Sequence, residues 1–221
     1  MVSPARAAAY ETVLRVFEQE AYADRALRTA AASLDQRDRA FAQRLAYGSI
    51  QRVRTLDYAI EQLGRRPVRK LDPPVRAALR LGAYELGFMQ TPRHAAVNEA
   101  VELVRAAKLE RAVAFTNAVL RRVAEGIDSL LASLPDGALK HSYPDWVELV
   151  WTPDFGRDEA LALMRARTRR RRRSCAWFGV RSKASRPTSR APIASSGSTK
   201  RRSPKAGSGR RAVAPSSPAS S

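Results

Sequence analysis

The sequence predicts an all-α fold for residues 1–125. Apolar residues recur there at spacings of three, four and seven, which line one face of an α-helix. No stretch of this part shows the period-two alternation that is typical of a half-buried β-strand. Prolines and acidic residues also stand where the apolar stripes begin. We therefore expect six or seven helices, enough to enclose a hydrophobic core.

The first two helices are expected within residues 3–32. Ser3 followed by Pro4 predicts a helix start, because serine favours the N-cap and proline lacks only an N–H that the first turn leaves unused. Apolar residues in 10–17 continue this helix to about Glu20. A shorter, alanine-rich helix is predicted for residues 24–32.

The third helical stretch covers residues 35–64. Asp35 and Asp38 predict its start, because acidic side chains in a first turn interact favourably with the helix dipole. Gly64 predicts its end. Since glycine is a poor helix former, we expect Gly48 to divide the stretch into two helices.

Three more helices are predicted after a basic loop. Pro73 opens the first, in which Gly82 indicates the close approach of a neighbouring backbone. The other two lie within residues 94–124. The second of these carries apolar residues on more than one side, so we expect it to be the central helix.

Two motifs in these last helices resemble a known family. Residues 97–103 (VNEAVEL) and 115–121 (FTNAVLR), in this order, are similar to the signature of the NusB-like RNA-binding domain. Residues 38–63 and 79–86 fit the same family. The resemblance implies a NusB-like helical bundle. Its two asparagines, Asn98 and Asn117, are expected to be buried, hydrogen-bonded and structural, because a buried amide without partners is costly.

The candidate RNA-binding residues are basic side chains of one loop and of the helix after it. Such cations neutralise phosphates and release counterions, which gives affinity without sequence readout. A solvated surface loop would show the same residues, so that alternative stays open. In antitermination relatives the RNA surface lies mainly around the N-terminal helices, which adds Arg6 and Arg15 as weaker candidates. The predicted RNA-binding set is Arg65, Arg66, Arg69, Lys70, Arg76 and Arg80.

Residues 126–166 are interpreted as a connector and the start of a linker domain. Residues 141–146 (HSYPDW) are expected to form a helix start, with Pro144 in the first turn and Trp146 as an apolar anchor. Placed after a NusB-like domain, this segment resembles the ribosomal RNA small-subunit methyltransferase B (Sun/RsmB) family. In that family it leads to a Rossmann-type domain that uses S-adenosylmethionine to make 5-methylcytosine.

The resemblance implies the RNA-binding N-terminal domain of an rRNA cytosine-5 methyltransferase, which helps to position ribosomal RNA. The alternative is a freestanding NusB-like transcription antitermination factor, which binds RNA with a ribosomal-protein partner and does not need residues 141–146. A third possibility is a helical interaction module without an RNA role.

Residues 167–221 differ sharply in composition from the rest. They hold 16 Lys and Arg and no acidic residue, whereas residues 1–166 hold 24 basic against 21 acidic residues. Leu, Ile, Val and Phe are too rare there to build a core, so we expect disorder. The dominant residue types are Arg, Ser, Ala, Pro and Gly, which GC-rich codons also yield when they are translated out of frame. Our hypothesis is a frameshift near Ala166.

We expect no catalytic, cofactor or metal site on this chain. The family's cysteine nucleophile stands in a Pro-Cys dipeptide, whereas the single Cys175 follows Ser174 in the arginine-rich tail. S-adenosylmethionine needs a glycine-rich turn between a strand and a helix. Residues 207–212 (GSGRRA) spell part of that pattern, but no strand or helix is expected beside them, so we interpret the match as chance. His94 and His141 do not have the spacing of a zinc site. No apolar run could cross a bilayer, and we expect a cytoplasmic protein.

Overall fold

The computed structural model describes the backbone of residues 2–174 and the side chains of residues 2–168. Every regular element in this part is helical, which confirms the predicted fold class. The α-helices are α1 (Pro4–Glu18), α2 (Ala23–Ala30), α3 (Gln36–Gln51), α4 (Val53–Gly64), α5 (Pro73–Phe88), α6 (Arg93–Ala106), α7 (Glu110–Ser133), α8 (Ala138–His141), α9 (Asp145–Phe155) and α10 (Arg157–Ser174), with a 3-10 turn, η1, at Val68–Lys70.

The predicted helix starts are confirmed at α1, α3 and α5. At α3, the Asp35 side chain accepts a hydrogen bond of 2.7 Å from the N–H of Asp38 and so satisfies a free donor of the first turn. At α1, Ser3 does not cap with its hydroxyl. Its N–H instead donates to Oε2 of Glu99 on α6, at 3.1 Å.

The stretch 35–64 is divided into two helices as predicted, but the break predicted at Gly48 is wrong. Helix α3 passes through this residue, and the break falls at Arg52. Glycine is needed at position 48 because the ring of Tyr84 on α5 occupies the space that a Cβ would fill. The close approach predicted at Gly82 is confirmed, but a side chain makes it: a Cβ there would lie 2.8 Å from Cδ2 of Leu120 on α7.

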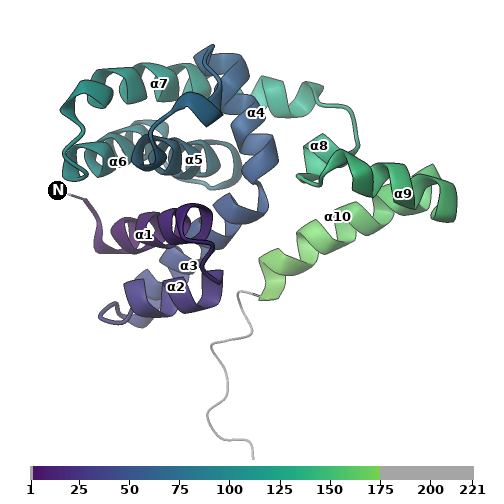
Figure 1. Cartoon of the computed structure of the whole chain (residues 1–221), viewed down its shortest axis with the longest axis horizontal. Coiled ribbons are helices and arrows are strands. Elements are labelled where there is room, and N and C mark those ends of the chain that lie inside the picture. Colours follow the sequence, from purple (N-terminus) through teal and green to yellow (C-terminus); the bar gives the residue numbers. More distant parts are fainter. Residues whose placement is uncertain (1, 175–221) are drawn as a thin grey trace, which may run out of the picture. The chain divides into compact units, whose positions relative to one another are not determined.

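Helix α5 is the central helix, which corrects the prediction of a central helix within residues 94–124. Its residues from Ala77 to Leu86 are buried without interruption. It packs against α1, α3, α4, α6 and α7. Figure 1 shows α5, α6 and α7 lying side by side, with α4 beside α7. This packing places the end of α4 against the outer helix α7.

The connector predicted from residue 126 starts later. Helix α7 continues to Ser133, and the chain leaves helical structure only at Leu134. The following short helix α8 is bonded to α4, because the Thr55 hydroxyl donates to the carbonyl of Leu139 at 2.8 Å. The Ser142 hydroxyl also accepts a bond from a backbone N–H of α4.

Trp146 is not the predicted apolar anchor of α9. Its side chain is 63% exposed, and Val147 is the buried residue of this helix. Pro144 precedes the helix as its N-cap rather than lying in the first turn.

Helix α10 extends into the segment that was expected to be disordered. Residues 167–174 are helical. The buried Thr168 hydroxyl donates to the carbonyl of Met164 at 2.8 Å, and Met164 itself is fully buried. Arginine is a good helix former, so the helix continues into the arginine run. The rest of the predicted tail, including Cys175, lies outside the described residues.

Candidate nucleic-acid interface

The loop after α4 presents its basic residues to solvent. Helix α4 ends at Gly64, and Arg65 adopts the left-handed conformation with φ of 54°. Val68 in η1 is buried, and its N–H donates to Oε1 of Glu61 at 2.8 Å. This anchor fixes the loop at one point. The side chains of Arg65, Arg66, Arg69 and Lys70 remain exposed.

The same loop lies against α7. A Cβ on the buried Gly64 would lie 3.0 Å from Cγ1 of Val119, so the end of α4 is in close contact with α7. Farther along the loop, the Arg66 guanidinium lies 5.4 Å from the centre of the Phe115 ring on α7. A cation over an aromatic face is an attractive arrangement. Arg66 is therefore held beside the helix.

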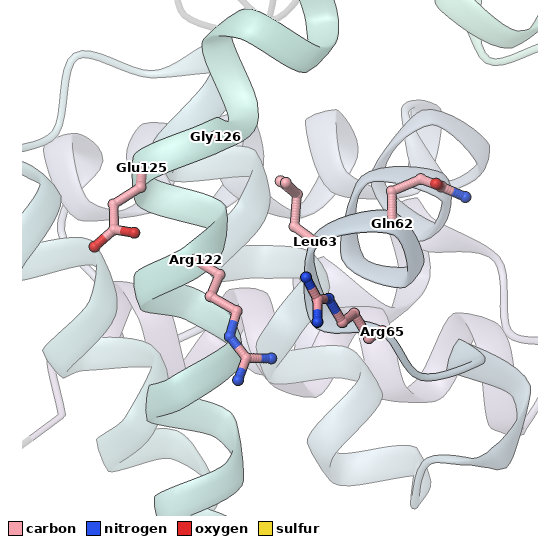
Figure 2. A pocket seen from close by; sticks show the side chains of 6 residues that line it. All are labelled: Gln62, Leu63, Arg65, Arg122, Glu125 and Gly126. Carbon is pink, nitrogen blue, oxygen red and sulfur yellow. The ribbon is translucent and has the colours of Figure 1, made fainter.

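A pocket of about 460 Å³ lies between α4 and α7 next to this loop. Figure 2 shows the Arg65 and Arg122 side chains extending into the space between the two helices. Gly126 forms part of the wall, and a Cβ there would lie 2.8 Å from Cδ2 of Leu63. The complete lining is Gln62, Leu63, Arg65, Arg122, Glu125 and Gly126.

Helix α7 contributes a basic stripe that sequence reasoning missed. Arg111, Phe115, Ala118 and Arg122 follow one another at spacings of four, three and four, which places them on one helix face. Both arginines are exposed. The spacing is visible in the sequence, but it points to an interface only once the loop arginines are known to lie beside it.

We call Arg65, Arg66, Arg111 and Arg122 the basic ridge. Within the part of the chain that the structure describes, none of these four arginines forms an ion pair, so their charge is available to an external anion. Guanidinium groups bind phosphate oxygens with paired hydrogen bonds. Arg69 and Lys70 stand in the same loop and are exposed as well.

The structure does not place Arg76 and Arg80 with this surface. Arg80 is buried, and its guanidinium donates two hydrogen bonds of 2.7 Å to the carboxylate of Asp57. Arg76 pairs with Glu18 of α1 at 2.5 Å. Both cations are neutralised by carboxylates within the fold, so Arg80 in particular cannot present its charge to RNA.

Arg6 and Arg15 are also held in ion pairs. Arg6 donates from Nε and Nη2 to the buried Glu85, at 2.9 and 2.7 Å, and so ties α1 to α5. Burial lowers the pKa of Arg6, but the hydrogen bonds and charge of Glu85, together with the charge of Glu99, raise it more, and the net pKa is raised. Arg15 pairs with Glu11 one turn earlier. Neither arginine is a free cation.

The prediction that Asn98 and Asn117 are buried is wrong. Asn98 is exposed and Asn117 is half-buried. The buried residues of this part of α7 are Thr116, Val119 and Leu120, so the helix is rotated relative to the expected face. Both asparagines line a groove between α6 and α7.

No helix among the described residues is long and apolar enough to cross a membrane. In the same part of the chain, no three His, Cys, Asp or Glu side chains are grouped as metal ligands would be.

Comparison with known proteins gives a consistent result. The family model described as the NusB family matches residues 3–125. A probable ribosomal RNA small subunit methyltransferase B of Synechocystis is 34% identical over 169 residues, which is 72% of this chain and 37% of that protein. The transcription antitermination protein NusB of Alkalilimnicola ehrlichii is 42% identical over 94 residues, or 42% of this chain and 53% of that protein.

The fold also matches solved structures. The crystal structure of the antitermination factors NusB and NusE in complex with double-stranded RNA contains a chain that superposes with a TM-score of 0.52 at 22% identity. The match covers 56% of this chain and 95% of that chain. This chain spans only about a third of the length of its methyltransferase B relatives.

Proposed function

The chain belongs to the NusB family, and from that premise we propose that it binds ribosomal RNA through the basic ridge, as the N-terminal domain of an rRNA (cytosine-5) methyltransferase. In this role the described residues hold RNA in position, and the methyl transfer takes place elsewhere in the enzyme.

The basic ridge is the observation that carries the proposal. It brings together arginines from the α4–α5 loop and from α7, which are separated by more than 40 residues in the sequence. Each guanidinium is free of carboxylate partners within the described residues, while other arginines of the bundle are paired. Free cations along one surface release counterions when phosphates replace them.

The length of the matches supports the methyltransferase over the antitermination factor. The NusB family model matches residues 3–125, whereas the Synechocystis methyltransferase relative aligns over 169 residues. That alignment is too long to end within the family domain. The antitermination relative aligns over 94 residues only. Similarity beyond the bundle is expected of a chain that continues as a methyltransferase.

The described residues do not fit S-adenosylmethionine. A nucleotide-like cofactor of this kind binds where a glycine-rich turn joins a strand to a helix. Residues 2–174 form helices and their connections, so they hold no such turn. We therefore propose that the cofactor binds outside them, in the full-length enzyme, and we derive no step of methyl transfer from this chain.

The salt dependence of RNA binding tests the proposal. In the full chain, Arg65, Arg66 and Arg122 are replaced together by glutamine, and affinity for a small-subunit rRNA fragment is measured over a range of salt concentrations. Loss of three phosphate contacts should flatten the plot of log affinity against log salt by about two units for single-stranded RNA. The basic tail is present in every variant and cancels in the comparison.

The matched control removes the same charge from α2 and α3. Arg25, Arg37 and Arg44 are exposed, form no ion pair with another described residue and lie outside the ridge, so their replacement by glutamine should leave the slope unchanged. Equal slopes for the two triple variants would contradict the proposal. Tighter binding on addition of a ribosomal protein would instead favour the antitermination factor.

A further inference from the structure

We propose that the groove between α6 and α7 binds one unpaired base of the RNA, with a preference for adenine or cytosine over uracil. The inference rests on the proposed function, because the ridge must first hold the RNA backbone. It assigns to Asn98 and Asn117 a role in base recognition rather than in the core.

The groove is open and lies along both helices. Its two sections, with volumes of about 350 and 560 Å³, share Asn98 from α6 and Asn117 and Arg121 from α7. The rest of the wall is mixed. Its apolar part, which suits the face of a base, consists of Val97, Val101, Val113, Ala114 and Ala124, and the other lining residues are Arg93, His94, Glu102, Arg105, Glu110 and Glu125.

The two amides at the centre of the groove have no hydrogen-bond partner among the described residues, whereas two arginines that line the groove are ion-paired. Neither Asn98 nor Asn117 forms a hydrogen bond with another described residue. Near the ends, Arg93 pairs with Asp128 at 2.6 Å, and Arg105 pairs with carboxylates of α6 and α7. Two unoccupied amides and the guanidinium of Arg121 therefore face an external ligand.

The chemistry of these groups matches the edge of a base. A carboxamide offers a donor and an acceptor side by side, which is the arrangement that asparagine uses to read adenine. Glu125 also lines the groove, and a carboxylate accepts from the exocyclic amine of cytosine or adenine. Uracil lacks that amine. The arginine can hold the phosphate attached to the same nucleotide.

The groove is continuous with the basic ridge. Arg121 lines the groove and its neighbour Arg122 lines the pocket beside Arg65. Glu125 lines both, and Figure 2 shows its carboxylate turned away from Arg65 and Leu63. A strand whose phosphates lie on the ridge can therefore place a base across α7. Contacts to phosphate fix the position, and the amides read the base.

The test replaces Asn98 and Asn117 together by alanine in the full chain. Fluorescence anisotropy then measures the affinities of short oligoadenylate, oligocytidylate and oligouridylate. The unmodified protein should prefer an amine-bearing oligomer over oligouridylate by about tenfold, the size expected of one good bidentate contact. The double variant should lose this preference, while its salt slope stays unchanged because no phosphate contact is removed. Gln36→Ala, which removes an exposed amide from α3, should keep the preference.

The outcomes separate the two proposals. The base site alone is overturned if the double variant still prefers oligoadenylate or oligocytidylate over oligouridylate. It is also overturned if the unmodified protein shows no such preference while its affinity still depends on the ridge. Affinity that does not depend on the ridge overturns the proposed function. Thermal unfolding adds a structural check: the double variant should melt at or above the temperature of the unmodified protein, because free amides leave no broken bond and alanine favours helix. A clear drop would mean that the amides are structural and would overturn the inference.

Discussion

The guanidinium of Arg80 on α5 donates two hydrogen bonds, each of 2.7 Å, to the two carboxylate oxygens of Asp57 on α4. The same guanidinium lies 4.4 Å from the centre of the Phe17 ring on α1. One side chain thus connects three helices. A residue that the sequence places beside a basic loop is in fact part of the packing of the bundle.

Replacing Arg80 by alanine should therefore reduce stability and leave RNA binding by the folded protein unchanged. The substitution leaves the Asp57 carboxylate without its partner, which costs about 2–4 kcal/mol for a largely buried pair. Urea denaturation would measure the loss as a lower midpoint. Replacing both partners with apolar residues, as in Arg80→Met with Asp57→Leu, should recover part of it. A flatter salt slope in Arg80→Ala would contradict the structural role.

Replacing Arg65 by glycine should have opposite effects on stability and on RNA binding. It is not a glycine, yet it holds a φ of 54° at the end of α4, where glycine is the preferred residue. Arg65→Gly should therefore raise the free energy of unfolding by about 0.5–1 kcal/mol. It should also weaken RNA binding, because the ridge loses one cation. Arg65→Ala separates the two effects: it should weaken binding equally without the gain in stability.

Stability above pH 10 should depend on Tyr10. Burial raises the pKa of Tyr10 to about 12, and its hydroxyl donates to the carbonyl of Pro74 at 3.2 Å. Tyrosine in an unfolded chain ionises near pH 10. As pH rises from about 10 to about 12, the unfolded state releases this proton and the folded state keeps it, so stability falls.

Thermal unfolding of the protein and of Tyr10→Phe over this pH range measures the effect. The variant has no ionisable hydroxyl at this position. The difference in thermal stability between the unmodified protein and Tyr10→Phe should be largest below pH 10 and should shrink toward pH 12. A constant difference across the range would show that Tyr10 is not protected from ionisation by the fold.

Local signals predicted the helices well. The starts of α1, α3 and α5 follow from residues adjacent in sequence, such as Pro4, Asp35 and Pro73, and those residues act within one turn. The helix break predicted at Gly48 was wrong because glycine leaves room there for the ring of Tyr84, a residue of another helix. Nothing close to Gly48 in the sequence reveals that contact.

The candidate site was predictable only in part, for a similar reason. The loop cations could be found by composition, but the pairing of Arg80 with Asp57 depends on the packing of α4 against α5. Asn117 was misplaced because α7 carries small and apolar residues on several sides. Its buried face, which includes Thr116 and Val123, could not be distinguished from its neighbours by spacing alone.

Photochemical cross-linking of the full chain to ribosomal RNA, followed by mass spectrometry of the peptides, tests the central claim most directly. If the basic ridge holds RNA, cross-links should concentrate in residues 65–70 and 111–122 and should disappear from both in the Arg65, Arg66 and Arg122 triple variant. Cross-links found only in residues 175–221, and unchanged in that variant, would show that the charge of the tail binds RNA and that the bundle does not.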